Sequence, residues 1–146
     1  MSKLISTLQQ LQQIRARAVD DMSQKLATQQ QVCQRYEKNI VALTSLSEGI
    51  AGVEENRAAL MFNQASYRRN IQRVIDWQKQ EQALADIEAR RLQQSLLAEA
   101  KREKSLTLVL DGKRAELQQE SARREQKNTD AVSTQSWLRQ QRLLKR

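Results

Sequence analysis

The chain has 146 residues, 39% of them hydrophobic but only 3% aromatic, with three glycines and no proline. This composition has too few bulky side chains for a thick globular core, and its abundance of Gln, Leu, Ala, Arg, Lys and Glu favours helix almost everywhere. One cysteine and no histidine exclude an internal disulfide and the usual Cys/His zinc site. We therefore predict an all-α fold with a narrow core.

The N-terminal third carries an apolar stripe whose members recur every three or four residues. Its mean step of about 3.55 residues lies between the 3.5 of a coiled coil and the 3.6 of a straight helix. We predict a first helix at about 3–47 that packs against a partner along this stripe, with Cys33 as a small core residue rather than a reactive thiol. The stripe comprises Leu4, Leu8, Leu11, Ile14, Ala18, Met22, Leu26, Cys33, Tyr36, Ile40 and Leu43, with Gln29 as an interruption.

Residues 48–55 are predicted to form the tip of a hairpin. Gly49 and Gly52 suit a chain reversal or a helix C-cap, and Glu54 and Glu55 suit the N-terminus of a following helix. The alternative is a kink in one very long helix, because a glycine costs only about 1 kcal/mol inside a helix. We favour the hairpin, because the apolar stripes on both sides then cover each other.

A second helix is predicted at about 56–125. Asp111-Gly112 offers a further turn and hence a three-helix bundle, but Leu117 is the only large apolar residue in 113–130, so a third helix there would have no face to bury. We expect the helix to pass Gly112 and fray, leaving a flexible tail at about 126–146. Its noisier stripe comprises Leu60, Phe62, Tyr67, Ile71, Val74, Ile75, Leu84, Ala85, Ile87, Ala89, Leu92, Leu96, Ala100, Leu106 and Leu110, with Gln78 and Gln82 where apolar residues would be expected.

No pattern of catalytic residues is found in the sequence. It has no Gly-rich phosphate loop, no histidine base and no glycine-flanked serine, so we predict no enzyme, no cofactor and no metal site. A secretion signal and an apolar run of membrane-spanning length are also lacking, which favours a cytoplasmic protein with at most peripheral membrane association.

The net charge of +8 is confined to the terminal regions of the sequence. Residues 31–100 carry nine basic and nine acidic side chains, whereas residues 101–146 carry twelve basic and six acidic side chains. A hairpin would bring both terminal regions, and hence the positive charge, to one end. Such a basic terminal end suits an acidic partner surface. The arginines that we predict for this contact are Arg123, Arg124, Arg139 and Arg142.

The segment 60–75, LMFNQASYRRNIQRVI, resembles the start of the second helix in the FliJ family of flagellar type III export proteins. The shared features are the chain length, the two helical arms, and an aromatic residue followed by apolar residues four and seven places on. The opening with Leu4, Leu8, Leu11 and the segment 19–22 is also similar. The resemblance implies an antiparallel two-helix coiled coil, similar to the central stalk of rotary ATPases.

The resemblance also implies partners and binding residues. It implies a non-enzymatic stalk that links a hexameric export ATPase to an export-gate membrane protein, peripheral to the inner membrane, with export chaperones as further candidate partners. The gate-contacting pattern falls on Tyr67, Ile71, Val74 and Gln78, with Tyr where the family usually has Phe. Whether these residues are exposed or continue the coiled-coil core is left open by the sequence. The basic terminal end of the hairpin would then contact the ATPase ring.

Three other interpretations stay open at this point. The stalk of a virulence type III secretion system has the same architecture. A coiled-coil adaptor or chaperone-escort protein would share the composition. A rod that binds nucleic acid is disfavoured, because Trp137 is the only aromatic residue that lies among the basic residues of this cluster. A rod that binds a membrane surface is disfavoured, because the apolar residues of 131–146 form no clean helical stripe.

Overall fold

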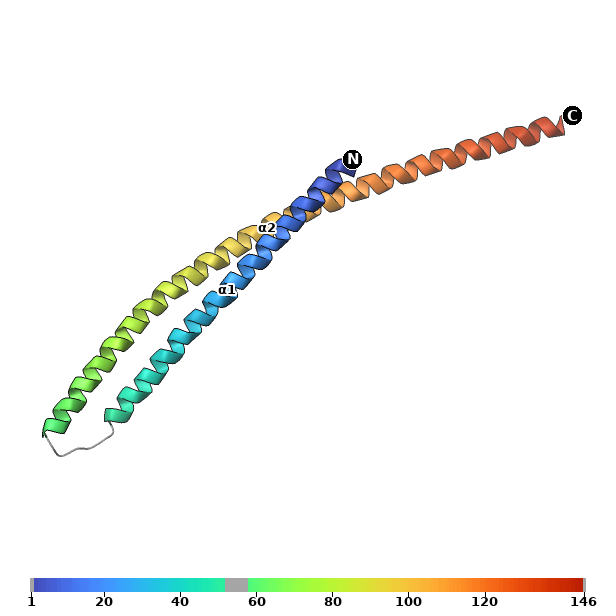
Figure 1. Ribbon diagram of the computed structural model, residues 1–146. Helices are drawn as coiled ribbons and strands as arrows, with labels where there is room; N and C mark the ends of the chain where they lie inside the picture. Colours follow the sequence, from blue (N-terminus) through green and yellow to red (C-terminus); the bar gives the residue numbers. More distant parts are fainter. Residues whose placement is uncertain (1, 52–57, 146) are drawn as a thin grey trace. The chain divides into compact units, whose positions relative to one another are not determined.

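The computed structural model describes residues 2–51 and 58–145, and all of these except residue 145 belong to two α-helices. Helix α1 spans Ser2–Ala51 and helix α2 spans Ala58–Leu144 (Figure 1). The two long helices pack against each other, so the predicted all-α helical hairpin is confirmed. Among the described residues, no helix is long and apolar enough to cross a membrane.

The chain divides into two compact units, each built from parts of both helices. One unit is Arg17–Ala100, which we call the loop-side unit; the other combines Met1–Ala16 with Lys101–Arg146, which we call the terminal unit. The same division separates the charge. The loop-side unit carries eleven basic and eleven acidic residues, and the terminal unit carries fourteen and six, so the whole net charge of +8 belongs to the terminal unit.

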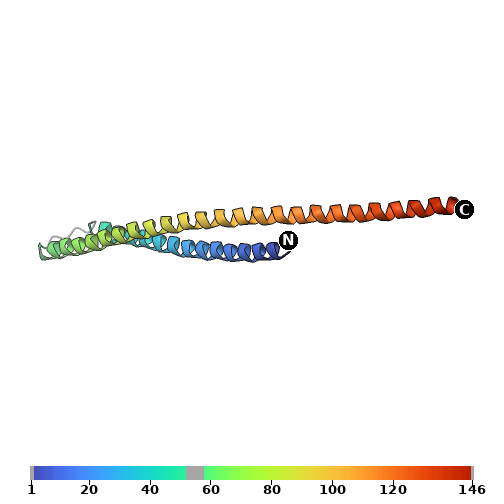
Figure 2. The ribbon, with the colours of Figure 1, turned by 90° about the horizontal axis from the view of Figure 1, so that it is seen from above.

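The helices of the loop-side unit run antiparallel and lie side by side in both views (Figures 1 and 2). Gln29 donates a hydrogen bond from Nε2 to the main-chain carbonyl oxygen of Ala85, at 3.1 Å. Nearer the loop, Ser47 lines a common groove with Ala65 and Gln72. Residue numbers therefore fall along α2 as they rise along α1, as a hairpin requires.

Burial along each helix repeats every seven residues in two lines, which together form the seam between α1 and α2. A repeat of seven residues gives the mean spacing of 3.5 that keeps one stripe against a partner helix. On α1 the lines are Ile5, Gln12, Val19, Leu26, Cys33, Ile40, Ser47 and Leu8, Met22, Gln29, Tyr36, Leu43, Ile50, each buried or half-buried. On α2 they are Gln64, Ile71, Gln78, Ala85, Leu92, Glu99, Leu106, Lys113 and Ile75, Gln82, Ala89, Leu96, Glu103, Leu110.

The predicted α1 stripe is correct from Ala18 onward and wrong in part before it. Leu4, Leu11 and Ile14 are exposed, and the seam uses Ile5 and Gln12 instead. The reason is the phase of the repeat: stepping back by sevens from Cys33 and Leu26 reaches Ile5, one position away from Leu4. On α2, Phe62, Leu84 and Ile87 of the predicted stripe are likewise exposed.

The core is thin, because the seam alternates apolar with polar side chains. The apolar residues that are buried among the described ones are Ile71, Ile75, Ala85 and Leu110, and Glu99 is a buried polar residue. Polar residues at seam positions specify the register of a coiled coil at a cost in stability.

Helix α1 continues through Gly49 to Ala51, beyond its predicted end at about residue 47. Gly49 has no positive φ and its Cα has open space around it, so it acts as an ordinary helical residue and not as a turn. Gly52, Glu54 and Glu55, the other residues of the predicted tip, lie outside the described residues. Gly112 lies inside α2, as predicted, and the alternative of a third helix beginning there is wrong.

In the terminal unit, α2 is longer than predicted and extends past the N-terminus of α1 (Figure 2). Every residue from 114 to 140 is exposed. One seam line, continued by sevens, reaches Glu120, Lys127 and Thr134, and the other reaches Leu117, Arg124, Ala131 and Leu138. Charged and polar residues thus break both lines, so this segment lacks a continuous apolar stripe for a coiled-coil partner. The structure shows helix to Leu144 where the sequence predicts a frayed tail.

Candidate functional site

The four residues of the predicted gate-binding pattern lie on two adjacent lines of α2 in the loop-side unit. Tyr67 and Val74, seven residues apart, are 52% and 42% exposed and flank the seam. Ile71 and Gln78, also seven apart, belong to the seam itself, and Ile71 is only 6% exposed. The structure therefore brings the four together as one strip, half of it on the surface and half beneath it.

The burial of Ile71 has a structural cause. It packs in the seam together with Ile75, one helical turn further on, and both isoleucines are almost fully buried. Tyr67 and Val74 therefore form the accessible surface of this strip, and Ile71 lies in the seam beside them. The predicted site thus separates into exposed and buried residues.

The flanking line contains one more apolar residue that the predicted pattern omits. Leu60 lies seven residues before Tyr67 and is exposed, so Leu60, Tyr67 and Val74 repeat at intervals of seven. On α1, Leu46 is also exposed, one position before the seam residue Ser47. The seven-residue spacing from Tyr67 could have indicated Leu60, but only the phase of the seam shows that this line faces outward.

Gln78 is the polar member of the strip. Its Oε1 is buried and has no hydrogen-bond partner in the described part of the chain. A buried acceptor without a donor typically costs about 1–3 kcal/mol. Gln78 therefore weakens the seam at this point, in contrast to Gln29, whose amide reaches a carbonyl of the opposite helix.

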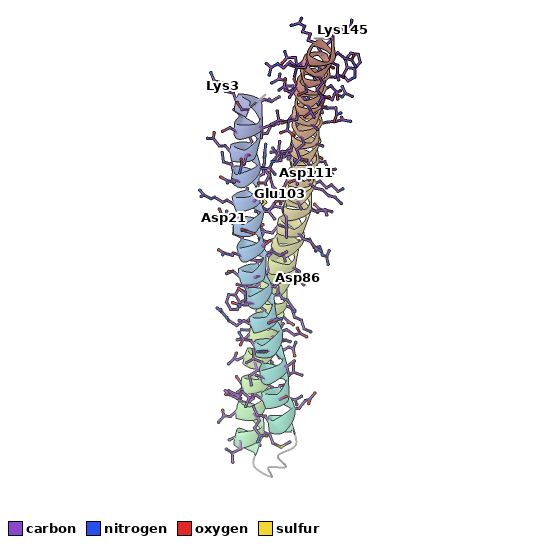
Figure 3. The ribbon with its side chains drawn as sticks, turned by 90° about the vertical axis from the view of Figure 1, so that its right-hand side faces the viewer. Lys3, Asp21, Asp86, Glu103, Asp111 and Lys145 are labelled. Carbon is purple, nitrogen blue, oxygen red and sulfur yellow. The ribbon has the colours of Figure 1, made fainter. Side chains whose placement is uncertain are left out.

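The four arginines predicted to bind the ATPase lie in the exposed C-terminal part of α2, within the terminal unit. Arg124 forms an ion pair with Glu120 at 3.0 Å, and Arg142 lies in the last turn of the helix. Arg123 and Arg139 are exposed, and Figure 3 shows side chains projecting all around this part of α2 as far as Lys145. Arg124 and Arg142 are eighteen residues apart, about five turns, so they share one face of the helix.

The charges around these arginines favour an anionic partner surface. Residues 131–146 contain four basic residues and no acidic one. The carbonyl end of a helix also attracts cations, which stabilises Arg142 where it stands. The arginines form two pairs, Arg123 with Arg124 and Arg139 with Arg142, separated by about 24 Å along the helix axis. A partner would therefore have to contact an extended surface rather than a single spot.

The only cysteine has a partner that lowers its reactivity. Burial raises the pKa of the Cys33 thiol, and the neighbouring Asp86 carboxylate raises it further through a hydrogen bond and its charge. A thiol is reactive as the thiolate, so this environment suppresses nucleophilic chemistry. Asp86, labelled in Figure 3, is half-buried on α2.

The remaining charged groups form surface pairs typical of an exposed coiled coil. Arg91 contacts Glu88 at 2.6 Å and lowers the pKa of that carboxyl group through the hydrogen bond. Lys113 pairs with Glu116 at 3.5 Å. Within residues 2–51 and 58–145, no three His, Cys, Asp or Glu side chains are grouped so that they could hold a metal ion.

A comparison with protein families matches residues 4–142 to the family described as flagellar FliJ protein. The match covers nearly all of both helices and includes all the site residues described above. No curated protein and no solved structure gives a significant match. The family resemblance that the sequence suggested is therefore confirmed over almost the whole chain.

Proposed function

This chain belongs to the flagellar FliJ protein family and has a role related to flagellar type III protein export; from this premise we propose that it is the non-enzymatic stalk coupling the hexameric export ATPase to the export gate. The observation that carries the proposal is the family match from residue 4 to residue 142, which runs through both arms of an antiparallel helix pair. A stalk needs a stiff rod with binding surfaces, and it needs no catalytic group.

The gate is proposed to bind the strip of Tyr67, Ile71, Val74 and Gln78. Tyr67 and Val74 supply exposed aromatic and aliphatic surface, which is the usual anchor of a protein interface. Ile71 supports this part of α2 from the seam, and Gln78 is the polar seam residue seven positions further on. The loop-side unit has no net charge, so this contact depends mainly on apolar surface.

The ATPase ring is proposed to bind the terminal unit through Arg123, Arg124, Arg139 and Arg142. The unit carries the whole net charge of the chain, and exposed guanidinium groups form strong paired hydrogen bonds with carboxylates. Charged groups attract a partner over about 8 Å at physiological ionic strength, so this contact should weaken as salt is added. The two surfaces thus differ in their chemistry, as a coupling between two unlike partners requires.

The proposed placement is cytoplasmic and peripheral to the inner membrane. It follows from the gate contact, since the gate is a membrane protein and the stalk would reach it without inserting. Export chaperones are further candidate partners, for which no surface is assigned.

Two sets of variants test the proposal, each with a matched control. The first set combines Tyr67→Ala with Val74→Ala, and its control combines Leu84→Ala with Ile87→Ala, two exposed apolar residues of the same helix. The first set should abolish binding to the purified cytoplasmic part of the gate and stop export, while ATPase binding and helicity stay unchanged. The control should leave gate binding and export intact.

The second set combines Arg139→Gln with Arg142→Gln, and its control combines Lys79→Gln with Arg90→Gln in the loop-side unit. The second set should weaken binding to the ATPase at low salt and leave gate binding unchanged. Gate binding that survives the loss of both Tyr67 and Val74 would overturn the gate assignment. ATPase binding that is equal in the arginine variant and its control would overturn the ring assignment.

A further inference from the structure

The terminal unit has apolar residues beside the seam that the hairpin does not cover. Leu4 and Leu11 each precede a seam residue of α1 by one position, and Val109 precedes the seam residue Leu110 of α2. Leu11 is 45% exposed and Val109 is 50% exposed. These residues belong neither to the gate strip nor to the arginine surface described above.

Leu11 and Val109 belong to one open groove between α1 and α2 of the terminal unit. Its floor includes the seam residue Leu106, and its rim is basic. The groove is lined by Leu11, Arg15, Lys101, Arg102, Ser105, Leu106 and Val109. Among the residues that the structure describes, none that lines this groove is acidic.

The width of the apolar face indicates the kind of occupant. A two-stranded coiled coil needs apolar residues on two lines only, whereas a third apolar line per helix is typical of helices that pack in a larger bundle. Leu4 and Leu11, seven residues apart, supply part of such a third line on α1, and Val109 widens the apolar face of α2 at one position. The groove therefore has the form of a seat for one additional helix, a recurring mode of peptide recognition.

The charge of the unit decides which helix can bind. A second copy of this chain would bring the same net charge of +8 to a surface that already carries it, and the segment 131–146 is itself basic. Arg15 and Arg102 also interact with other groups of the chain. The attraction for an anionic helix comes from the net charge of the whole unit, so it does not depend on these two residues being unpaired. The positive charge of the unit therefore attracts an acidic helix, whereas it repels a second copy of the chain and the segment 131–146.

We propose that the groove lined by Leu11, Leu106 and Val109 binds an amphipathic helix of a partner protein, with leucine-type residues on its apolar face and Asp or Glu beside them. The apolar face would fill the groove, and the acidic residues would lie against Lys101 and the other basic residues of the rim. The groove adds a binding surface beyond the gate and ring contacts, and it stands even if those assignments fail.

The test uses two synthetic peptides of about three heptads, identical in their leucines and differing only in whether Glu or Lys flanks them. Each fluorescently labelled peptide is titrated with the full-length protein, and anisotropy reports binding. The Glu peptide should bind at least about tenfold more tightly than the Lys peptide, because opposite charges attract and like charges repel. Equal affinity for both peptides, or no binding of the Glu peptide, would overturn the proposal.

Substitutions then locate the binding. Leu11→Gln with Val109→Gln should weaken the Glu peptide by about tenfold or more, whereas Leu108→Gln, at a residue 63% exposed outside the groove, should not. Lys101→Glu should weaken it as well, and Lys104→Glu on the same helix, outside the groove, should weaken it less. Circular dichroism verifies that each variant is folded, and the charge reversals keep the test valid if the first pair disturbs the helix.

Other occupants would give different results. If sedimentation shows a dimer that Leu11→Gln with Val109→Gln dissolves, the groove binds a second copy and the proposal is wrong. If vesicles of phosphatidylserine retain the protein, and the same substitutions release it while the Glu peptide does not compete, the occupant is a lipid surface and the proposal is equally wrong.

Discussion

Gln29 and Ala85 join the two helices by a hydrogen bond of 3.1 Å from a side-chain amide to a main-chain carbonyl. The contact is possible because Ala85 is small and buried at a seam position, so the Gln29 side chain can reach the backbone of α2. That carbonyl already accepts the hydrogen bond of the α-helix, so Gln29 uses its second lone pair. The bond fixes which residues of α1 and α2 stand opposite each other.

We predict that Gln29→Leu makes the hairpin more stable but less specific in its register. Leucine would bury more apolar surface, and the lost bond is worth only about 1 kcal/mol because water offers the amide similar bonds in the unfolded chain. Urea denaturation should show a gain of about 1 kcal/mol. Spin labels at exposed positions 30 and 84 should show a broader distance distribution than in the parent protein. A loss of stability would show that Gln29 contributes more than its bond.

Gln78→Leu should stabilise the seam by about 1–3 kcal/mol, because it removes a buried acceptor that has no partner. Thermal denaturation measures the gain. Gln80→Leu, at an exposed position two residues away, is the control and should change stability by less than about 0.5 kcal/mol. If Gln78→Leu is neutral while its control behaves as expected, the Oε1 of Gln78 finds a donor in solution.

The fold was largely predictable from the sequence, and the phase of the seam was only partly so. Ile71 and Ile75 identify the seam of α2, because each belongs to one of the two lines that repeat every seven residues. Near the N-terminus, Leu4 and Leu11 form a more apolar stripe than Ile5 and Gln12 do, so local periodicity favours the wrong line. The continuous repeat through Cys33 and the pairing with α2 decide between them, and pairing is a tertiary property.

The candidate site shows the same limit. The spacing of Tyr67, Ile71, Val74 and Gln78 places them on one side of a helix, but it does not tell which of them the partner helix covers. The extension of α2 to Leu144 does not follow from the sequence either, because residues 113–130 offer little apolar surface for packing against a partner.

Ile71→Ala and Tyr67→Ala should differ sharply in their effect on stability. Ile71 is almost fully buried, so its truncation should cost about 2–5 kcal/mol, whereas Tyr67 is half exposed and should cost well under 2 kcal/mol. Urea denaturation of the two single variants measures this difference. Equal losses would contradict the division of the strip into exposed and buried residues.

The pH dependence of stability should include a contribution from Cys33. Its pKa is raised in the folded chain by burial and by Asp86, so the folded state holds the thiol proton more tightly than the unfolded state does. This contribution is fully present below the unfolded pKa of about 8.5 and is lost as pH rises through the higher folded pKa. Cys33→Ser should remove that loss on the alkaline side.

Asp86→Asn provides a second measurement of the same effect. It removes one cause of the raised pKa, so the thiol should react faster with a disulfide reagent at pH 8 than in the parent protein. Asp76→Asn, at an exposed position of the same helix, serves as the control and should leave the rate unchanged. Identical rates in all three proteins would show that Asp86 does not act on Cys33.

The central proposal is that one chain serves a whole ATPase ring as its stalk, and native mass spectrometry of the complex between this protein and the purified export ATPase tests it most directly. The stalk proposal predicts one copy of this chain for each ATPase hexamer, and a further copy should not bind at excess. One chain per ATPase subunit would contradict it and would favour an adaptor or chaperone-escort protein instead.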